Sequence, residues 1–360
     1  MTTIADPPTA AQPVLGDHPV FGGVDTHADT HTAAVIDGAG RLLGHRQFPA
    51  TEAGYGALAA WLAAHGQVQR VGVEGTGVYG AGLARHLTAL GMELVEVDRP
   101  DRKTRRFAGK SDPIDAEAAA RAALAARSTG IPKARTGPVE AVRALRVARR
   151  SAITARAEAQ TQLKALLVTA PEPLRAQLRE LTTRQLVIAC AALRPDTDRI
   201  ADPVHATKTA LRTLARRHQQ LTAEIADLDA DLAPLVARIN PALTAATGIG
   251  TDVAGQLLVT AGDNPDRLRS EAAFAALCGV SPIPASSGRT HRHRLNRGGD
   301  RQANCALYRV VLCRMRWDPR TRAYVQRRTE EGLSKKDIIR CLKRYIAREL
   351  FYLLTSPQTA

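Results

Sequence analysis

Four carboxylates stand where predicted elements of secondary structure begin or end. Asp25 ends one apolar run and Glu74 ends another, whereas Asp112 and Asp115 lie three residues apart at a helix start and can point to one face. Carboxylates crowded together repel one another unless cations neutralise them, and hard oxygen ligands select Mg²⁺ or Mn²⁺. The four acids therefore predict a metal site, in which two ions would stabilise the attacking and leaving oxygens of a phosphodiester reaction.

Each acid also has an explanation without a metal. Asp112 would cap the helix, Pro113 would occupy its first turn, and Asp115 would be favoured by the helix dipole. Asp25 and Glu74 would be plain strand ends. Each acid alone is weak evidence, and the set of four at these positions favours the metal site.

Histidine pairs are further candidates for metal ligands or for a base. His27 and His31 are four residues apart, and His291 and His293 are two apart. A zinc site needs a fuller set of ligands than a short histidine pair supplies. We therefore interpret both pairs as incidental.

The most distinctive segment runs from residue 285 to residue 300. Ser286 and Ser287 precede Gly288, and arginines follow at Arg289, Arg292, Arg294, Arg297 and Arg301. A serine hydroxyl is a poor nucleophile unless its proton is removed or cations stabilise the developing charge. Guanidinium groups bind phosphate in bidentate fashion. Two interpretations stay open: a nucleophilic serine beside the scissile phosphate, or a solvated basic loop that only contacts phosphates.

A second candidate for phosphate binding is Thr247-Gly248-Ile249-Gly250, between two apolar helical segments. A Gly-x-Gly turn that opens a helix lets backbone N–H groups approach a phosphate closely. Gly248 and Gly250 thus resemble part of a helix-hairpin-helix motif for the DNA backbone. A plain glycine turn between helices explains the segment equally well.

The elements that must position the acids follow a recognisable order. We predict strands over 20–25, 32–37 and 41–48, a helix capped by Thr51 and running to Gly66, a strand over 68–74, a helix over 80–90, a strand over 93–97 and a helix from about 112 to 126. Three strands in a meander followed by alternating helix and strand indicate an α/β ribonuclease-H-like fold. Its first and fourth strands are neighbours, which would bring Asp25 and Glu74 together.

The middle of the chain, about 137–239, is helical in character. Apolar residues at alternating spacings of three and four form a heptad seam: Leu211, Leu214, His218, Leu221, Ile225, Leu228, Leu232, Leu235 and Ile239. Pro234 should kink or end this helix, and 142–168 is a plausible partner helix. An antiparallel coiled-coil arm, a dimer contact and an ordinary helical hairpin within a core all stay open.

The C-terminal part is predicted to be mainly α. A short segment, 277–284, leads into the basic loop, and helices follow over 302–315 and over 334–354, the last capped by Ser334 with Asp337. The predicted division is a disordered leader (1–18), a catalytic domain (19–130), a helical coiled-coil region (137–240) and a C-terminal domain (241–355).

Composition points to a polyanionic partner. The 360 residues carry a formal charge of +15, and residues 285–350 alone hold 18 Lys and Arg against 6 Asp and Glu. Binding of phosphates by Lys and Arg releases condensed counterions, so a strongly basic segment favours nucleic acid. Because most of the excess charge lies in one part of the chain, a general effect on solubility is a weaker explanation.

Cysteines and hydropathy argue against other classes of protein. The five cysteines form no CxxC pair and are odd in number, which favours reduced thiols over a disulfide framework. No stretch of 18 apolar residues occurs, so we expect no membrane span. The N-terminal segment lacks the basic and apolar regions of a signal peptide. We expect a cytoplasmic protein.

Taken together, the acids and the distant serine loop resemble the DEDD transposases of the IS one-ten family of bacterial insertion sequences, also described as bridge-RNA-guided recombinases. The resemblance covers residues 20–354. Its motifs are Val24-Asp25-Thr26-His27, Val73-Glu74-Gly75-Thr76-Gly77, Ser111-Asp112-Pro113-Ile114-Asp115-Ala116, Gly279-Val280-Ser281-Pro282 and Leu295-Asn296-Arg297-Gly298-Gly299-Asp300.

The resemblance implies a RuvC-like domain that holds Mg²⁺ (or Mn²⁺) at Asp25, Glu74, Asp112 and Asp115, and a coiled coil used in oligomerisation. It implies a nucleophilic serine in the C-terminal domain. By its place before Gly288 this role falls on Ser287, with Ser286 close enough to leave the choice open. It further implies a covalent phosphoserine link to DNA, a synaptic tetramer with a site built from two subunits, and a noncoding bridge RNA that pairs with donor and target DNA.

Two rival functions remain. A RuvC-like junction-resolving endonuclease would use the same acids with water as its nucleophile, and the serine loop would only bind DNA. A non-catalytic nucleic-acid-binding protein would bind without cutting. A serine-to-alanine variant that still cleaves would favour the first rival, and intact acids and serines argue against the second.

Overall fold

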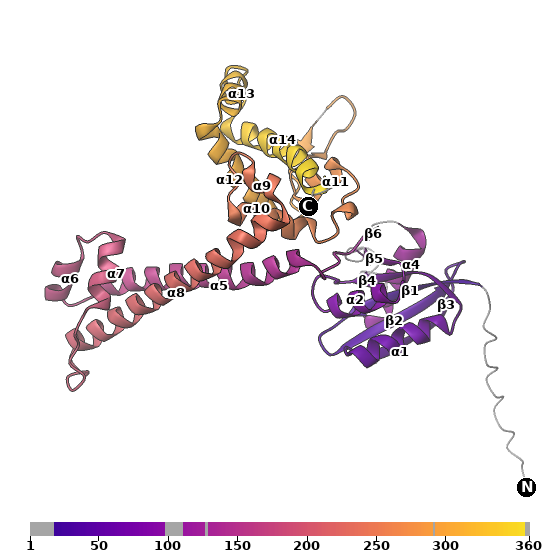
Figure 1. Ribbon diagram of the computed structural model, residues 1–360, viewed down its shortest axis with the longest axis horizontal. Coiled ribbons are helices and arrows are strands. Elements are labelled where there is room, and N and C mark those ends of the chain that lie inside the picture. The colour runs from indigo at the N-terminus through magenta and orange to yellow at the C-terminus, as the bar shows by residue number, and fades with distance from the viewer. Residues whose placement is uncertain (1–17, 98–110, 127–128, 291, 357–360) are drawn as a thin grey trace, which may run out of the picture. The chain divides into compact units, whose positions relative to one another are not determined.

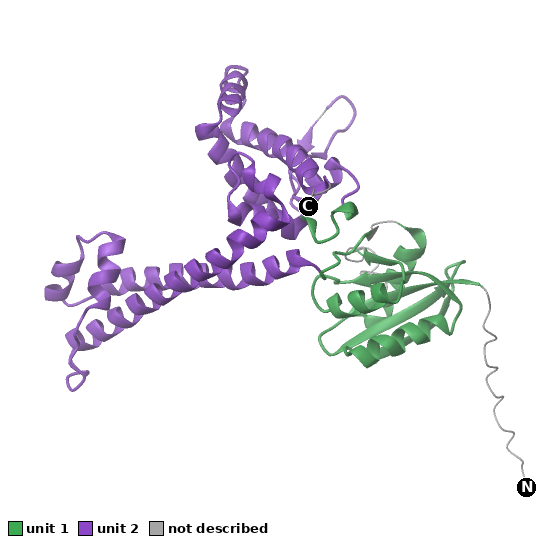
Figure 2. Ribbon diagram, viewed as in Figure 1, with its two compact units in different colours: residues 1–136, 261–267 green, residues 137–260, 268–360 purple. Residues whose placement is uncertain are grey.

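The computed structural model describes residues 18–97, 111–126, 129–290 and 292–356. It divides into two compact units, residues 1–136 with 261–267 and residues 137–260 with 268–360 (Figures 1 and 2). Apart from His18, the predicted leader lies outside the described residues. The predicted division into a catalytic domain, a helical region and a C-terminal domain stays a prediction.

The first unit is built around a six-stranded sheet. Its strands are β1 (Pro19–Thr26), β2 (Thr30–Asp37), β3 (Leu42–Pro49), β4 (Gln67–Glu74), β5 (Leu94–Val97) and β6 (Thr129–Gly130), and their order in the sheet is β3-β2-β1-β4-β5-β6. β1 pairs antiparallel with β2 and parallel with β4. The predicted meander is confirmed, and so is the predicted neighbourhood of the first and fourth strands.

Helices cover both faces of this sheet. Successive residues of a strand point to opposite faces. A Cβ on Gly22 would lie 3.0 Å from Leu62 of α1 (Glu52–Ala63), whereas one on Gly23 would lie 2.1 Å from the backbone N of Ala120 of α4 (Asp112–Ala125). The face toward α1 and α2 (Ala81–Ala89) carries the main apolar core. The other face is covered by α4.

α4 lies unusually close to the sheet because both surfaces are small. Its buried residues are Asp115 and four alanines, Ala116, Ala119, Ala120 and Ala123. Opposite them stand Gly23 on β1 and Gly72 on β4, where a Cβ would approach the helix backbone to 2.1 and 2.4 Å. Only glycine fits at such distances. The alternation of β1 then places Asp25, two residues after Gly23, on the same face as α4.

Two distant segments complete the first unit. Asn264 accepts a hydrogen bond from the backbone N of Ala134 (3.0 Å) and donates one to the carbonyl of Pro132 (3.0 Å). Arg267 donates to the carbonyl of Ile131 at 3.0 Å. Residues 261–267 are therefore part of this unit although they come long after β6 in the sequence.

The second unit contains a long antiparallel pair of helices, α5 (Pro138–Val168) and α8 (Pro203–Ile239) (Figure 1). All nine residues of the predicted seam are buried or half-buried, and Arg149 of α5 forms an ion pair with Asp229 of α8 (2.5 Å). The predicted partner helix is therefore confirmed. Pro234 lies inside α8, which continues to Ile239, so of the two expected effects it does not end the helix, and a kink stays a prediction.

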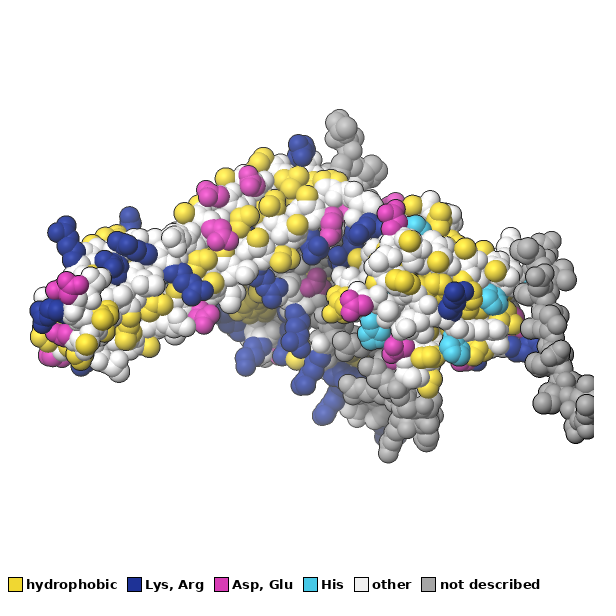
Figure 3. Space-filling model, turned by 90° about the horizontal axis from the view of Figure 1, so that it is seen from below, with side chains coloured by type: hydrophobic (Ala, Val, Ile, Leu, Met, Phe, Trp, Pro, Cys, Tyr) yellow, Lys and Arg dark blue, Asp and Glu magenta, His cyan; other side chains and the backbone are white. Residues whose placement is uncertain are grey.

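The far end of this pair has a small core of its own. α6 (Glu172–Leu178) and α7 (Thr183–Ala191) pack against it through apolar residues such as Leu174, Leu186 and Leu211. Exposed Lys and Arg side chains surround this tip, with acidic side chains among them, on the face drawn in Figure 3.

The remainder of the second unit is mainly helical. Its elements are α9 (Pro241–Ala245), α10 (Thr251–Ala261), the 3₁₀ turn η1 (Pro265–Arg267, counted with the first unit), α11 (Glu271–Leu277), α12 (Arg301–Trp317), α13 (Pro319–Glu330) and α14 (Lys335–Thr355), with a short hairpin of β7 (Ile283–Pro284) and β8 (His293–Arg294). The predicted cap of the last helix is confirmed, since Ser334 accepts from the backbone N of Asp337 (3.2 Å). None of the described helices is long and apolar enough to cross a membrane.

Candidate active site

Two of the predicted acids meet on the α4 face of the sheet. The Nε2 atom of His27 lies 3.3 Å from a carboxylate oxygen of Asp25 and 3.4 Å from one of Asp112. One ligand atom from each of the three side chains lies within 4.8 Å of the others. Asp25 is only 9% exposed, whereas the side chains of His27 and Asp112 are 48% and 41% exposed, so the cluster is buried on the strand side and open to solvent on the other.

Asp112 reaches this cluster because it does not cap its helix. The alternative explanation, in which Asp112 is the N-cap of α4, is wrong. Ser111 is the N-cap, with φ −150° and ψ 153°, and Asp112 is the first helical residue. Its carboxylate is therefore free of the capping role and turns toward Asp25 and His27.

Asp115 adds a second negative charge near Asp25. It is 3% exposed and lies one turn along the same face of α4. Burial raises the pKa of Asp25, and the charges of Asp112 and Asp115 raise it further, while His27 lowers it. A site in which buried carboxylates destabilise one another is suited to a cation. The structure thus brings Asp25, Asp112 and Asp115 into electrostatic contact.

Glu74 is placed beside this cluster by its backbone. It ends β4, and the parallel register pairs Val73 with Val24, one residue before Asp25. Thr26 donates its hydroxyl proton to the carbonyl of Glu74 (2.8 Å). Among the described residues, the Glu74 side chain is not part of the three-residue cluster. Its role as a fourth ligand stays a prediction.

The serine loop is a tight β-hairpin. Ile283 pairs with Arg294 and Pro284 with His293, and Ser287 exchanges backbone hydrogen bonds with Thr290 at 3.2 and 3.0 Å. Gly288 has φ +54° in the first central position of the turn, the geometry of a type II′ turn, which favours glycine there. We expected an irregular loop, and the hairpin was not predicted.

The two serines differ in what their hydroxyls contact. Ser286 Oγ accepts from the backbone N of Arg292 (3.2 Å) and lies 3.3 Å from its carbonyl oxygen, so it helps to close the hairpin. Among the described residues, the hydroxyl of Ser287 has no hydrogen-bond partner, and Ser287 is exposed. Both serines are exposed, and of the two the Ser287 hydroxyl is the one that is not used to close the hairpin.

Comparison with known proteins finds family matches for both the segment with the acidic cluster and the segment with the serine hairpin. A family model described as "Transposase" (DEDD, IS110) matches residues 22–170, and a second, described as "Transposase IS116/IS110/IS902 family", matches residues 240–326. The two ranges include Asp25, Glu74, Asp112, Asp115 and Ser287. The chain belongs to the IS110 family of transposases.

Two relatives of this IS110-family chain are encoded by insertion elements. The "insertion element IS110 uncharacterized 43.6 kDa protein" of Streptomyces coelicolor is 32% identical over 117 residues, 32% of this chain and 29% of the relative. The "insertion element IS900 uncharacterized 42 kDa protein" of Mycobacterium paratuberculosis is 29% identical over 149 residues, 41% of this chain and 37% of the relative. The matches thus span about a third of the length of each relative.

The arginines around the hairpin have no acidic partner in the part of the chain that the structure describes. Among the described residues, no carboxylate lies within ion-pairing distance of the predicted phosphate contacts on and after the hairpin, Arg289, Arg292, Arg294, Arg297 and Arg301. Elsewhere in the same unit, arginines such as Arg314 and Arg344 are paired with acids. This IS110-family chain therefore keeps its hairpin arginines available for an external anion.

The glycine turn at 247–250 is packed against α12. Arg314 Nε donates to the carbonyl of Thr247 (2.8 Å), and a Cβ on Gly248, whose φ is +82°, would touch Arg314 and Cys313 at 3.4 Å. Gly250 is open, since a Cβ there would meet nothing within 4 Å. Helices α9 and α10 flank the turn as predicted, and phosphate binding by Gly248 and Gly250 stays a prediction.

His27 is the member of the site that sequence reasoning set aside. Its pairing with His31 suggested an incidental pair, and His31 is indeed fully buried and stacked on Tyr55. The two histidines lie at opposite ends of a turn between β1 and β2, and only His27 points to the acids. In the sequence, only the position of His27 directly after Asp25-Thr26 marked this residue. That position indicates the end of a strand and gives no information about a contact with α4.

Proposed function

We propose that this chain cuts and rejoins the DNA of an insertion sequence, with Ser287 as nucleophile and a Mg²⁺ site at Asp25, Glu74, Asp112 and Asp115. The observation that carries the proposal is the convergence of Asp25, which is buried, and Asp112 on one imidazole, that of His27. The sheet order, with the meander beside a parallel β4, supports a ribonuclease-H-like, RuvC-like domain.

The residues present fit a divalent cation. Carboxylate oxygens are the ligands that Mg²⁺ and Mn²⁺ prefer. Burial raises the pKa of Asp25, and the charges of Asp112 and Asp115 raise it further, so a cation here would stabilise the ionised carboxylate. His27 Nε2 stands where a positive group is favourable, 3.3 and 3.4 Å from two carboxylates. When bound, Mg²⁺ would supply charge that stabilises the attacking and leaving oxygens of the phosphodiester.

The chain's own nucleophile is the hydroxyl at the hairpin turn. Ser287 Oγ attacks the phosphorus, the bond from phosphorus to the leaving sugar oxygen breaks, and that oxygen takes up a proton while the serine gives up its own. The strand is then held as a phosphoserine ester. A sugar hydroxyl of the incoming strand attacks the same phosphorus, which joins the strands and restores the serine. The unpaired arginines, Arg289 and Arg292 nearest the turn, would bind the phosphate oxygens.

The proposed partners follow from charge and from the family. Donor and target DNA and a noncoding bridge RNA are polyanions, which suits a segment rich in Arg without counter-ions. Guidance by RNA would leave the protein to bind backbones and not to read base edges.

The α5–α8 pair is a candidate coiled coil for a dimer, and two dimers would form a synaptic tetramer. Such an enzyme would act in the cytoplasm, at the nucleoid.

A trapping assay tests the nucleophile. Purified protein, the RNA flanking the element, Mg²⁺ and labelled donor and target DNA are mixed, denatured and separated on a gel. We expect a covalent protein–DNA band with the natural protein and with Ser286→Ala. The band should be lost with Ser287→Ala, because its hydroxyl forms the link.

The other outcomes choose among the rivals. Cleavage without a covalent band in the natural protein would indicate water as nucleophile and a junction-resolving endonuclease. A band lost with Ser286→Ala but kept with Ser287→Ala would move the role to Ser286. Tight binding without cleavage under any metal would indicate a non-catalytic nucleic-acid-binding protein.

A further inference from the structure

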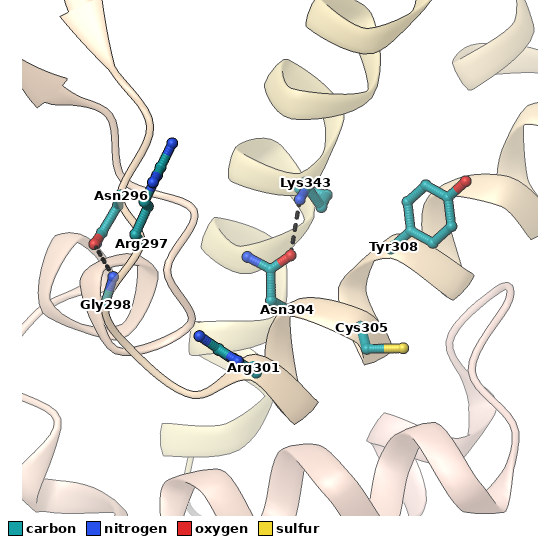
Figure 4. Close-up of a pocket in the computed structure, with 8 residues that line it drawn as sticks. All are labelled: Asn296, Arg297, Gly298, Arg301, Asn304, Cys305, Tyr308 and Lys343. Atoms are coloured by element: carbon teal, nitrogen blue, oxygen red, sulfur yellow. Dashed lines mark hydrogen bonds between the residues drawn. The ribbon is translucent and has the colours of Figure 1, made fainter.

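A basic hollow lies at the base of the serine hairpin, and all of its lining residues come after Ser287 in the sequence. Its volume is about 480 Å³, and it is lined by the segment after β8 and by helices α12 and α14 (Figure 4). Arg297 comes from the segment, Arg301 and Tyr308 from α12, and Lys343 from α14. Three of the lining side chains are cationic, and none of the described ones is acidic.

The cations of this hollow have hydrogen-bond donors to spare for an anion. Lys343 Nζ donates to Oδ1 of Asn304 (2.9 Å), its only partner among the described residues. The amide nitrogen of Asn304 donates in turn to the carbonyls of Cys278 (3.0 Å) and Gly279 (3.1 Å), which fixes the amide orientation. An ammonium group has three donors, so two remain. Burial lowers the pKa of Lys343, and the charge of Arg340 lowers it further, which an anion would reverse.

An aromatic ring stands at the other end of the hollow. Tyr308 follows Arg301 by seven residues on α12, about 10 Å along the helix axis and on the same face. Tyr308 is 41% exposed, so it is accessible to a ligand from solvent. Figure 4 shows Arg297 and Arg301 on one side of Lys343 and Asn304, and Tyr308 on the other. The hollow is thus cationic at one end and aromatic at the other.

We propose that this hollow binds one unpaired nucleotide of a nucleic-acid strand, its phosphate at Arg297, Arg301 and Lys343 and its base against Tyr308. The inference rests on the proposed function, since it assigns a subsite for a strand that the serine hairpin would cut or hold. A phosphate alone would fill little of the volume. A base in a duplex has both faces stacked on its neighbours, so only an unpaired base offers a face to the ring.

Binding is tested by fluorescence anisotropy with a short labelled single strand of mixed sequence, as DNA and as RNA, and with the matched duplex. EDTA is present throughout, so no cleavage is required. Tyr308→Leu should weaken single-strand binding by about 5- to 150-fold, the usual effect of losing one stacked base, and should leave duplex binding unchanged. Tyr308→Phe keeps the ring and should bind like the natural protein.

The phosphate end is tested by salt dependence. Lys343→Gln should reduce the slope of log affinity against log salt by about 0.7, the loss of one phosphate contact to a single strand. Lys336→Gln is the matched control, because Lys336 is an exposed lysine two turns earlier on α14 and does not line the hollow. Lys336→Gln should leave this slope as it is in the natural protein.

A footprint at Cys305 gives a second readout. Cys305 lines the hollow and is exposed, so alkylation of its thiol can be followed by peptide mass spectrometry. A bound single strand should protect it in the natural protein and in Lys336→Gln, and should fail to protect it in Lys343→Gln combined with Tyr308→Leu. A stronger effect with DNA than with RNA, or the reverse, would identify which strand supplies the nucleotide.

Two results would overturn the proposal: Tyr308→Leu binding single strands as well as the natural protein, or losing duplex and single strand equally. Either would leave the proposed function intact, because the covalent trapping assay depends on Ser287 and not on this hollow. Conversely, a failed trapping assay with a normal footprint would reject the serine mechanism and keep the nucleotide site.

Discussion

The acidic cluster and the serine hairpin are held in opposite ways. Asp25 is 9% exposed at the end of a central strand, and α4 lies against that strand so closely that a single methyl group at Gly23 would collide with its backbone. Ser287 is exposed at a turn that two backbone hydrogen bonds close, with a further contact from Ser286. One region is a fixed part of a core, and the other projects from its unit.

The difference matches what each region would have to hold. Carboxylates that repel one another stay together only if the backbone that carries them cannot move apart, so they need a packed support. A phosphate-binding hairpin has to fit a flexible strand, and its arginines lose no internal ion pair when they bind. In the proposed function, the first unit would hold the carboxylates in fixed positions and the hairpin of the second unit would bind phosphate.

The largest effect should come from Asp25→Asn, which preserves shape and removes one charge. Cleavage should fall by about a thousandfold or more, because the electrostatic support of the reacting oxygens is lost. Without Mg²⁺ the same variant should be more stable than the natural protein at pH 7, by about 1 kcal/mol, since a buried carboxylate beside Asp112 and Asp115 is removed.

The sign of this stability change depends on pH. The pKa of Asp25 is raised above 3.8, so the folded protein holds this proton more tightly than the unfolded chain, and ionisation lowers stability as pH rises above that value. The advantage of Asp25→Asn should therefore shrink toward pH 4, as urea titrations would measure. Asp29→Asn, an exposed acid four residues away, is the control. If the natural protein, Asp25→Asn and Asp29→Asn are equally stable at pH 7, the ionised carboxylate of Asp25 does not destabilise the folded protein, and this prediction is wrong.

Gly23→Ala tests whether the close packing of α4 is needed. The new Cβ would lie 2.1 Å from the backbone N of Ala120 and 2.2 Å from the carbonyl of Ala116, so the helix has to move. We expect a loss of about 3 kcal/mol in the free energy of unfolding, in line with overpacked cores. Gly38→Ala, where the nearest atom is 3.5 Å away, should be neutral in the same denaturation experiment.

Much of the first unit could be predicted from sequence. Alternating apolar residues and glycine punctuation marked β1 to β5, and Thr51 was correctly read as the cap of α1, since it accepts from Gly54 N at 3.2 Å. The seam of α8 was also correct, because a buried stripe repeats at helical spacing. In each case the signal lies within one stretch of chain.

The missed features depend on neighbours in space or lack apolar periodicity. His27 joins the site through contact with Asp112, 85 residues later, which no local pattern encodes. The hairpin around Ser287 is polar on both strands, so its register comes from the turn and not from burial. Helix α13 was missed because Thr321 is its only buried residue, although Asp318-Pro319 is a good helix start.

The smallest effect should come from glycine-to-alanine changes at two turns of the second unit where the glycine has a positive φ. These changes also test most directly whether the serine hairpin, unlike the packed acidic cluster, can change shape without loss of stability. Gly288 has φ +54° and Gly332 has φ +84°, and a Cβ at either position would meet nothing within 4 Å. Each change should therefore cost only the strain of a left-handed alanine, about 1 kcal/mol. Gly332 lies just after α13, so its cost should appear as a lower free energy of unfolding.

At Gly288 the same strain should reduce the yield of the covalent DNA product and leave the free energy of unfolding unchanged. The hairpin is held by few bonds and can relax without unfolding its unit, so the melting temperature should not change. The turn would shift, and a misplaced Ser287 hydroxyl should reduce the covalent DNA product by about tenfold or more. Gly332→Ala should form that product normally. If Gly288→Ala traps DNA as well as Gly332→Ala does, the position of the turn is unimportant and the hairpin only binds phosphates.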